Sequence, residues 1–242
     1  MSKVRAIHPI QPLTDVRVVI LTGTLVPSLG RSLYQPLVKF FLGVRGYLTD
    51  VVCIPRLGLG DLDEANDELA EVIFAAHPNS RFILVGHSQG GLHAILLAHR
   101  FPDRVVAVFN FGAPHHGTQL ARMAPWLPKH PAVRAMASHS ERLRELRAAN
   151  VFPPDLIYSF YTLFDQLVFP WFSPALRGAN NVLVAPEIFH WFLKRIGQRR
   201  SAGVELVHGV SEHVFVIWLA CLHDCIATAL DGLEALALEP VA

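Results

Sequence analysis

Short apolar runs alternate with longer amphipathic segments along the first half of the chain. Four runs rich in β-branched residues are expected to be strands, at 17–21, 50–54, 81–85 and 104–111. Their apolar character at successive positions is typical of strands covered on both faces, as in a parallel sheet. Apolar side chains recur at helical spacing between these runs, over residues 61–76 and 88–100. The alternation predicts an α/β fold with helices on both faces of a mostly parallel central sheet.

The pattern changes after Gly117, where residues 118–155 become Pro-punctuated and Arg-rich. We interpret this stretch as a helical insertion over the sheet. Later segments are expected to form strands at 156–162, 181–184 and 204–209, a helix within 186–200 and a long helix from about His213. A length of 242 residues with 52% apolar composition fits a single domain over 1–242.

Charge and composition exclude several classes of protein. The formal net charge of +1 gives no electrostatic reason to expect a nucleic-acid partner. The first residues show no signal-peptide pattern, which favours a cytoplasmic protein with membrane association left open. The most apolar long segment, 214–230, contains His223 and Asp224 and is short for a spanning helix, so a buried helix is expected. Three cysteines, an odd count, favour neither disulfides nor a zinc site.

The sequence VGHSQGG at 85–91 is the strongest chemical signal. G-x-S-x-G follows an apolar strand and opens a helix, as a nucleophile elbow requires, with Ser88 as nucleophile. The sharp turn needs small residues two positions on either side, and Gly86 and Gly90 supply them. The alternative is an ordinary glycine-rich turn or a phosphate-binding loop. G-x-G-x-x-G and a Walker lysine are both missing, which argues against the phosphate loop.

A serine nucleophile needs a histidine base and a carboxylate that orients it, in the chain order Ser, Asp, His for this fold. Asp165 is the best candidate acid because it comes just after an expected strand and before an apolar pair and a proline. Asp155 precedes that strand, Asp103 follows a helix and Asp224 lies within one. The competing interpretation of Asp165 is a loop aspartate that caps a turn.

His213 is the best candidate base, because it stands between an expected strand and the final helix. His208 is the second choice, although it lies in the strand-like run and fits a buried structural histidine. His223 and His190 lie on expected helices, and Glu212 is a candidate for tuning or capping beside the base.

An oxyanion hole needs two preorganised donors, the amide after the nucleophile and one from the turn after an early strand. Gln89 and Thr24 occupy these positions. Gly23 would let the backbone approach the substrate, and the Thr24 hydroxyl is a candidate third donor. A plain strand-ending turn is the alternative.

Five segments resemble the bacterial and fungal single-domain lipases of the α/β-hydrolase superfamily. They are LTGT at 21–24, GHSQGG at 86–91, FGAPHHGT at 111–118, YTLFDQLVFP at 161–170 and RGANNVLV at 177–184. The resemblance runs over most of the chain. It implies an acyl-enzyme mechanism on lipid esters without a cofactor, with Ser88, Asp165 and His213 as triad and Thr24 and Gln89 as oxyanion hole.

Two features depart from that family. Many such lipases have His where this chain has Thr22, and many are secreted and disulfide-bonded. The departures favour an intracellular or membrane-edge substrate. His115 and His116 are interpreted as a structural turn and not as metal ligands, since no carboxylate or cysteine lies at suitable spacing.

The insertion at 118–155 lies where lids occur in this fold. An amphipathic lid would expose its apolar side chains at a lipid surface, whereas a core element would bury them. The apolar side chains of the insertion are Leu120, Met123, Trp126, Leu127, Val133 and Met136. The aromatic run at 169–172 could line an acyl pocket or pack in the core. An acyltransferase or thioesterase with the same triad, and a non-catalytic lipid-binding protein, remain as alternative functions.

Overall fold

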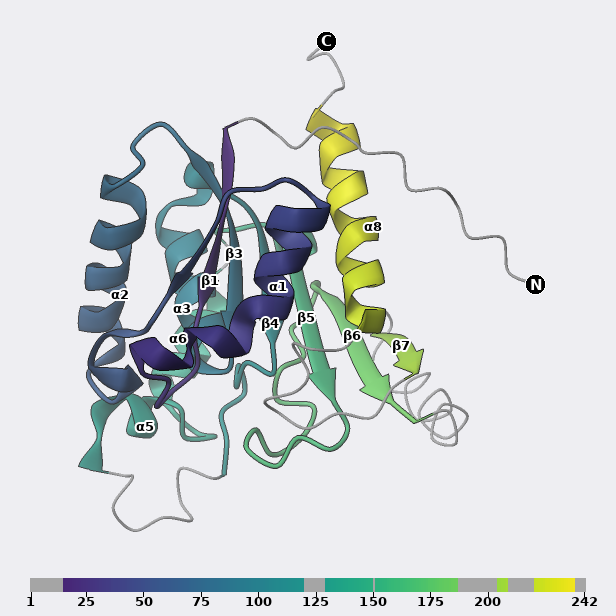
Figure 1. Cartoon of the computed structure of the whole chain (residues 1–242). Coiled ribbons are helices and arrows are strands. Elements are labelled where there is room, and N and C mark those ends of the chain that lie inside the picture. The colour runs from purple at the N-terminus through teal and green to yellow at the C-terminus, as the bar shows by residue number, and fades with distance from the viewer. Residues whose placement is uncertain (1–14, 120–128, 150, 187–203, 209–219, 238–242) are drawn as a thin grey trace.

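The computed structural model describes residues 15–119, 129–149, 151–186, 204–208 and 220–237. Within these ranges, seven strands form one parallel sheet in the order β2-β1-β3-β4-β5-β6-β7 (Figure 1). The strands are β1 (Val16–Leu21), β2 (Thr49–Val52), β3 (Arg81–His87), β4 (Val105–Phe111), β5 (Ile157–Thr162), β6 (Asn180–Ala185) and β7 (Val204–His208). The expected parallel α/β sheet is confirmed.

The strand that was expected at 50–54 ends earlier, at Val52. Its last carbonyl accepts a hydrogen bond from the Thr22 amide at 3.1 Å. Ile54 precedes Pro55, and a residue before proline is restricted in conformation while the proline itself has no amide to donate to a strand. The chain therefore leaves the sheet before Ile54.

The described helices are mostly short, and several continue as tighter or wider turns. They are α1 (Gln35–Val38, then a π-helical stretch Lys39–Val44), α2 (Leu62–Ala70, then π-helical Glu71–Ala75), α3 (Gln89–Arg100), α5 (Pro131–Ala135), α6 (Glu141–Ala148) and α8 (Ala220–Ala237). Helical turns of the 3-10 type occupy Ser28–Tyr34, Pro55–Gly58, Pro102–Arg104 and Pro154–Leu156. Asp61 caps α2 by accepting hydrogen bonds from the Asp63 and Glu64 amides.

Helices cover both faces of the sheet (Figure 1). On β1, Val18 and Ile20 pack in a cluster with buried side chains of α1 and α8. Val19 and Leu21, which point to the other face, pack with α2, α3 and α6. The expected cover of helices on both faces of the sheet is confirmed. The central strands therefore pack apolar side chains against helices on both faces.

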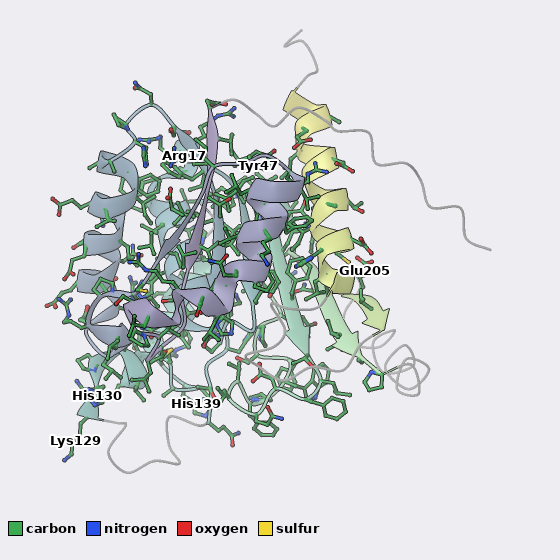
Figure 2. The ribbon with its side chains drawn as sticks, in the orientation of Figure 1. Arg17, Tyr47, Lys129, His130, His139 and Glu205 are labelled. Carbon is green, nitrogen blue, oxygen red and sulfur yellow. The ribbon has the colours of Figure 1, made fainter. Side chains whose placement is uncertain are left out.

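All strands run the same way, so their carboxyl ends share one edge of the sheet. Figure 2 shows Arg17 and Tyr47 near the amino-terminal end of the sheet, with His130 and His139 at the opposite end. Loops at the carboxyl edge are where open α/β sheets bind their ligands.

The described part of the insertion packs in the core. Val133, Met136, Leu143 and Leu146 are buried, and the last three belong to the cluster that includes α2 and α3. The other four apolar positions of the expected lid, 120, 123, 126 and 127, lie outside the described residues. Val133 and Met136 therefore follow the core alternative, and the lid stays a prediction.

A buried ion network attaches α8 to the rest of the chain. The Arg45 guanidinium lies 2.7 Å from Asp231 and 3.1 Å from Glu234, and the Tyr47 hydroxyl donates to Glu234. Arg45 and Glu234 are both almost fully buried. None of the described helices is long and apolar enough to cross a membrane.

Candidate active site

Ser88 lies at the turn between β3 and α3, with φ 54° and ψ −124°. This conformation is unfavourable for a residue with a side chain, and it is the geometry expected of a nucleophile elbow. The Ser88 amide donates to the Phe111 carbonyl at 2.8 Å, and the Ser88 carbonyl accepts from the Gly91 amide at 3.0 Å. These bonds tie the turn to β4 and to the first turn of α3.

The turn is too tight for side chains at its two flanking glycines. A Cβ on Gly86 would lie 2.3 Å from the Gly91 Cα, and one on Gly90 would lie 2.4 Å from the Leu21 carbonyl oxygen. Both distances are well inside van der Waals contact with backbone, which cannot move away cheaply. The geometry therefore requires glycine at both positions.

The turn after β1 contacts the elbow through a side-chain hydrogen bond. The Thr24 hydroxyl donates to the Gln89 side-chain oxygen at 2.7 Å. The Gly23 amide donates to the Tyr34 hydroxyl at 2.9 Å, which in turn lies 3.0 Å from the His87 Nδ1. Burial raises the pKa of Tyr34 to about 12, so the phenol keeps its proton. The structure thus brings the two proposed oxyanion residues into direct contact.

A third segment at this place was not found from the sequence. Arg56, Leu57 and Gly58 all have positive φ, and the Leu57 carbonyl accepts from the Leu25 amide at 2.8 Å. A Cβ on Gly58 would lie 2.4 Å from the Gln89 Oε1. The run PRLGLG, with its proline and glycines just after a strand, was the available signal.

Backbone strain gathers around the elbow. Positive φ in non-glycine residues occurs, within the described ranges, at Leu25, Arg56, Leu57 and Ser88. The Leu25–Leu57 bond and the Thr24–Gln89 bond link these residues into one cluster. Strained residues concentrate at functional sites, because the surrounding structure must over-determine them.

Asp165 lies three residues beyond the end of β5 and is only 5% exposed. Its Oδ1 accepts hydrogen bonds from the Leu167 amide at 2.9 Å and the Val168 amide at 2.6 Å. This is the turn-capping arrangement considered as its alternative, and it also fixes the direction of the carboxylate. Asp155, by contrast, lies before β5, and Asp224 lies within α8.

The candidate base His213 lies outside the described residues. The strand before it, β7, ends at His208, which pairs with Ala185. His223 is on α8 and stacks on Phe40, while His190 and Glu212 also lie outside the described ranges. Ser88 and Asp165 thus both follow strands at the carboxyl edge, and the role of His213 stays a prediction.

His115 and His116 form a turn after β4. His115 is fully buried, and burial, together with the charges of His116 and Arg147, lowers its pKa to about 3. The His116 ring lies 3.0 Å from the Ala175 carbonyl. Over the part of the chain that the structure describes, no group of three metal-ligating side chains occurs.

Comparison with solved structures gives the same architecture. Aspergillus fumigatus lipase B superposes with a TM-score of 0.60 at 21% identity, over 83% of this chain and 49% of that one. Bacillus licheniformis lipase BlEst2 gives 0.57 at 18% identity, over 92% of this chain and 93% of that one. Paleococcus ferrophilus monoacylglycerol lipase gives 0.56 at 15% identity, over 92% and 96%. At these identities the likeness shows the fold.

Sequence comparison agrees over shorter segments. A probable esterase, PIR7A, of Oryza sativa subsp. indica is 47% identical over 49 residues, which are 20% of this chain and 19% of that protein. The chain therefore matches about one fifth of the length of this curated relative. The family model described as the alpha/beta hydrolase fold matches residues 56–155, which include the elbow. By its sheet, its elbow and this match, the chain has the α/β-hydrolase fold.

Proposed function

We propose that the protein is a serine hydrolase that cleaves carboxylic esters, with Ser88 as nucleophile, His213 as general base and Asp165 as orienting acid. The observation that carries the proposal is the conformation of Ser88. A serine at φ 54° at the carboxyl edge of the sheet presents its hydroxyl above the turn, beside the loop that contains Thr24. Residues held in so unfavourable a backbone conformation cluster at functional sites, which supports a chemical role for Ser88.

The proposed reaction passes through an acyl-enzyme. The Ser88 oxygen attacks the ester carbonyl carbon while His213 takes the hydroxyl proton. The resulting oxyanion accepts hydrogen bonds from the Thr24 and Gln89 amides. His213 then gives the proton to the departing alcohol, and water releases the acid by the same steps in reverse order. Asp165, held by two backbone amides, would orient the imidazole and stabilise its positive charge.

The Thr24 hydroxyl supports this assignment in a second way. It donates to the Gln89 side chain, which joins the turn that supplies one amide to the helix start that supplies the other. Catalysis by such a site depends on donors that are already in place before charge develops. The contact between the two residues would keep their amides at a fixed separation.

Apolar side chains at the same edge favour a lipid ester. Leu25 and Leu29 follow β1 and are 50% and 90% exposed. After β5, Phe164, Phe169 and Phe172 are 39%, 52% and 52% exposed. Exposed apolar side chains gathered beside a site are typical of surfaces that bind apolar ligands. Lipase B and the monoacylglycerol lipase, which have the same fold, are named for lipid substrates. The proposal includes peripheral contact of this protein with a lipid surface.

The test is hydrolysis of p-nitrophenyl esters from acetate to palmitate by the wild-type protein and by Ser88→Ala. A serine far from the elbow, Ser80, precedes β3 at the opposite edge, so Ser80→Ala is the matched control. We expect turnover that rises toward longer acyl chains, is lost in Ser88→Ala and is retained in Ser80→Ala. A short-chain optimum would contradict the lipid substrate. Turnover that persists in Ser88→Ala, or none on any ester, would contradict the hydrolase.

A further inference from the structure

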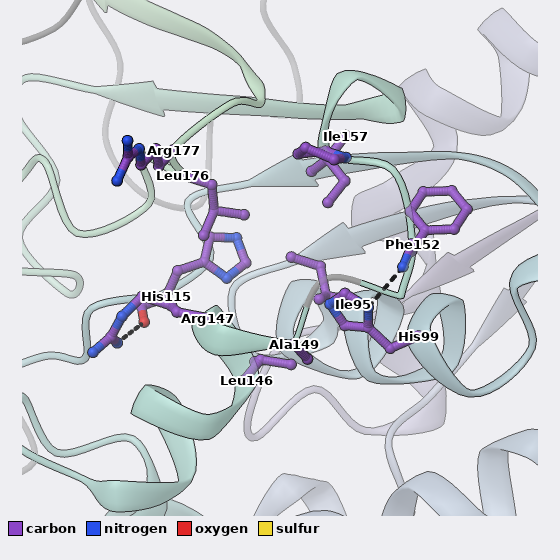
Figure 3. Close-up of a pocket in the computed structure, with 11 residues that line it drawn as sticks. Ile95, His99, His115, Leu146, Arg147, Ala149, Phe152, Ile157, Leu176 and Arg177 are labelled. Carbon is purple, nitrogen blue, oxygen red and sulfur yellow. Dashed lines mark hydrogen bonds between the residues drawn. The ribbon is translucent and has the colours of Figure 1, made fainter.

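A small hollow lies on the face of the sheet that carries α3 and α6 (Figure 3). It encloses about 40 Å³ and opens to solvent. A space of this size holds a few water molecules or the charged end of a small ligand. Neither the elbow nor the turn after β1 contributes to its lining, so it is separate from the proposed active site.

Two arginines line the hollow without a carboxylate partner. Arg147 comes from the last turn of α6 and Arg177 from the turn before β6, and neither forms an ion pair within the described residues. The Arg147 Nη1 donates to the His115 carbonyl at 2.6 Å, as the dashed line in Figure 3 shows. None of the lining residues is acidic. Burial, together with the neighbouring Arg144, lowers the pKa of Arg147, as expected for a cation whose charge is not compensated.

The other arginines of α6 differ in this respect. Arg142 contacts Asp63 and Glu145, and Arg144 contacts Glu141. Among the three arginines of α6, Arg147 alone has no carboxylate partner within the described residues.

His115 adds an unused polar atom to the same lining. Its ring lies among the lining residues in Figure 3, and its Nε2 is 3.3 Å from the Asn110 amide nitrogen. The ring is neutral and has one proton, so an Nε2 that accepts from this amide leaves the proton on Nδ1. Nδ1 is buried and has no partner among the described residues. The lining thus has two guanidinium groups and no acidic acceptor, and His115 adds a buried ring nitrogen without a partner among the described residues.

We propose that this hollow binds a small carboxylate, with its oxygens on Arg147 and Arg177 and its alkyl group against the apolar wall. A guanidinium presents paired donors that match the two oxygens of a carboxylate. Ile95, Phe152 and Ile157 supply the apolar surface beside these donors. Phosphate would use the same donors but gains nothing from that wall. The proposal does not depend on the ester hydrolysis proposed for Ser88.

The test is a titration of the full chain with acetate, butyrate and inorganic phosphate at constant ionic strength. Binding is measured by isothermal calorimetry and by the shift in Tm. We expect saturable butyrate binding, tighter than that of acetate or phosphate. Arg177→Gln should weaken butyrate binding at least tenfold. Because Arg177 is exposed and has no ion pair among the described residues, its replacement should not affect folding.

Arg144→Gln is the matched control, since it also removes one positive charge, from α6 beside Arg147, at a position that does not line the hollow. It should leave the butyrate affinity within twofold of the wild type. Equal weakening in both variants would show a general charge effect and overturn the proposal. The proposal would also be overturned if butyrate showed no saturable binding, or if Arg177→Gln left its binding unchanged. Tighter binding of phosphate than of butyrate would overturn the assignment of a carboxylate as the ligand.

Discussion

Ser88 combines an unfavourable backbone conformation with the proposed chemical role. Such strain costs about 1–3 kcal/mol, whereas glycine adopts positive φ readily but loses about 0.5–1 kcal/mol through its freedom in the unfolded chain. Ser88→Gly should therefore have a free energy of unfolding about 1 kcal/mol higher than Ser88→Ala. Both variants should lack ester turnover. Urea denaturation of the two variants measures the difference, and equal stabilities would show that the elbow is not strained.

Gly58 is the residue whose backbone meets the Gln89 side chain. Gly58→Ala places a methyl group where the Gln89 Oε1 now lies, in addition to the strain of alanine at φ 72°. We expect kcat on esters to fall about tenfold, because oxyanion donors act only when correctly placed. Steady-state kinetics with a short ester measures this fall.

Gly178→Ala is the control for the strain alone. Gly178 has φ 83° but meets only the Pro154 ring, at 3.2 Å or more, away from the elbow. Both variants should lose about 1–2 kcal/mol of stability, the usual penalty of left-handed backbone for alanine. If kcat were unchanged in Gly58→Ala, the turn at 56–58 would have no part in positioning the oxyanion residues.

The candidate site was predictable to the extent that its signals are local. The elbow motif and its glycines follow from seven consecutive residues, and the capped turn of Asp165 follows a recognisable strand. The turn at 56–58 was missed because its left-handed conformation depends on contacts with Leu25 and Gln89, which are distant in sequence. A pattern of spacing cannot report such contacts.

At the scale of elements, α8 depends on the ion network at its carboxyl-terminal half. Glu234→Gln removes a charge that faces a nearly fully buried Arg45. Breaking a buried pair on one side usually destabilises by about 3–5 kcal/mol, and Asp231, which also contacts Arg45, should limit the loss to the lower end of that range. Thermal or urea unfolding measures the loss.

Asp50→Asn is the exposed counterpart of this change. It breaks the Arg17–Asp50 pair, whose aspartate side chain is 49% exposed, and should cost less than about 1 kcal/mol. A loss in Glu234→Gln no larger than in Asp50→Asn would show that the buried network does not hold α8.

The elements themselves were largely predictable, and their ends were less so. Each expected strand is present, because apolar runs on both faces of a parallel strand leave a strong pattern. The segment expected as one helix over 61–76 ends its α-helical bonding at Ala70 and continues in a wider turn to Ala75. A single wider turn leaves the apolar spacing nearly unchanged, so the sequence pattern does not report where the α-helical bonding ends.

At the scale of the whole molecule, buried histidines make stability depend on pH. Burial lowers the pKa of His93 to about 4, below its ordinary value of 6.5. Above pH 6.5 the folded and unfolded chains are both neutral at this site. As the pH falls from 6.5 to 4, the unfolded chain takes up a proton that the folded chain does not, so stability falls by about 1.4 kcal/mol per pH unit.

His93→Gln should remove that contribution and reduce the slope of the free energy of unfolding against pH between pH 6.5 and 4, while His115, whose pKa is also lowered, keeps its own contribution. The measurement is urea denaturation at a series of pH values, compared by slope and not by absolute stability. The exposed His139 offers a control, since His139→Gln should keep the wild-type slope. The same slope in His93→Gln and the wild type would show that His93 is protonated in the folded protein.

The central claim is that Ser88 is a nucleophile, and reaction with a fluorophosphonate tests it most directly. In this reaction the serine oxygen bonds to phosphorus, fluoride leaves and the hydroxyl proton is released. Intact-mass and peptide analysis should find one phosphonate per chain, on Ser88, with ester turnover falling in proportion to labelling and no label on Ser88→Ala. An unlabelled protein, or a label on another residue with Ser88 unmodified, would contradict the account.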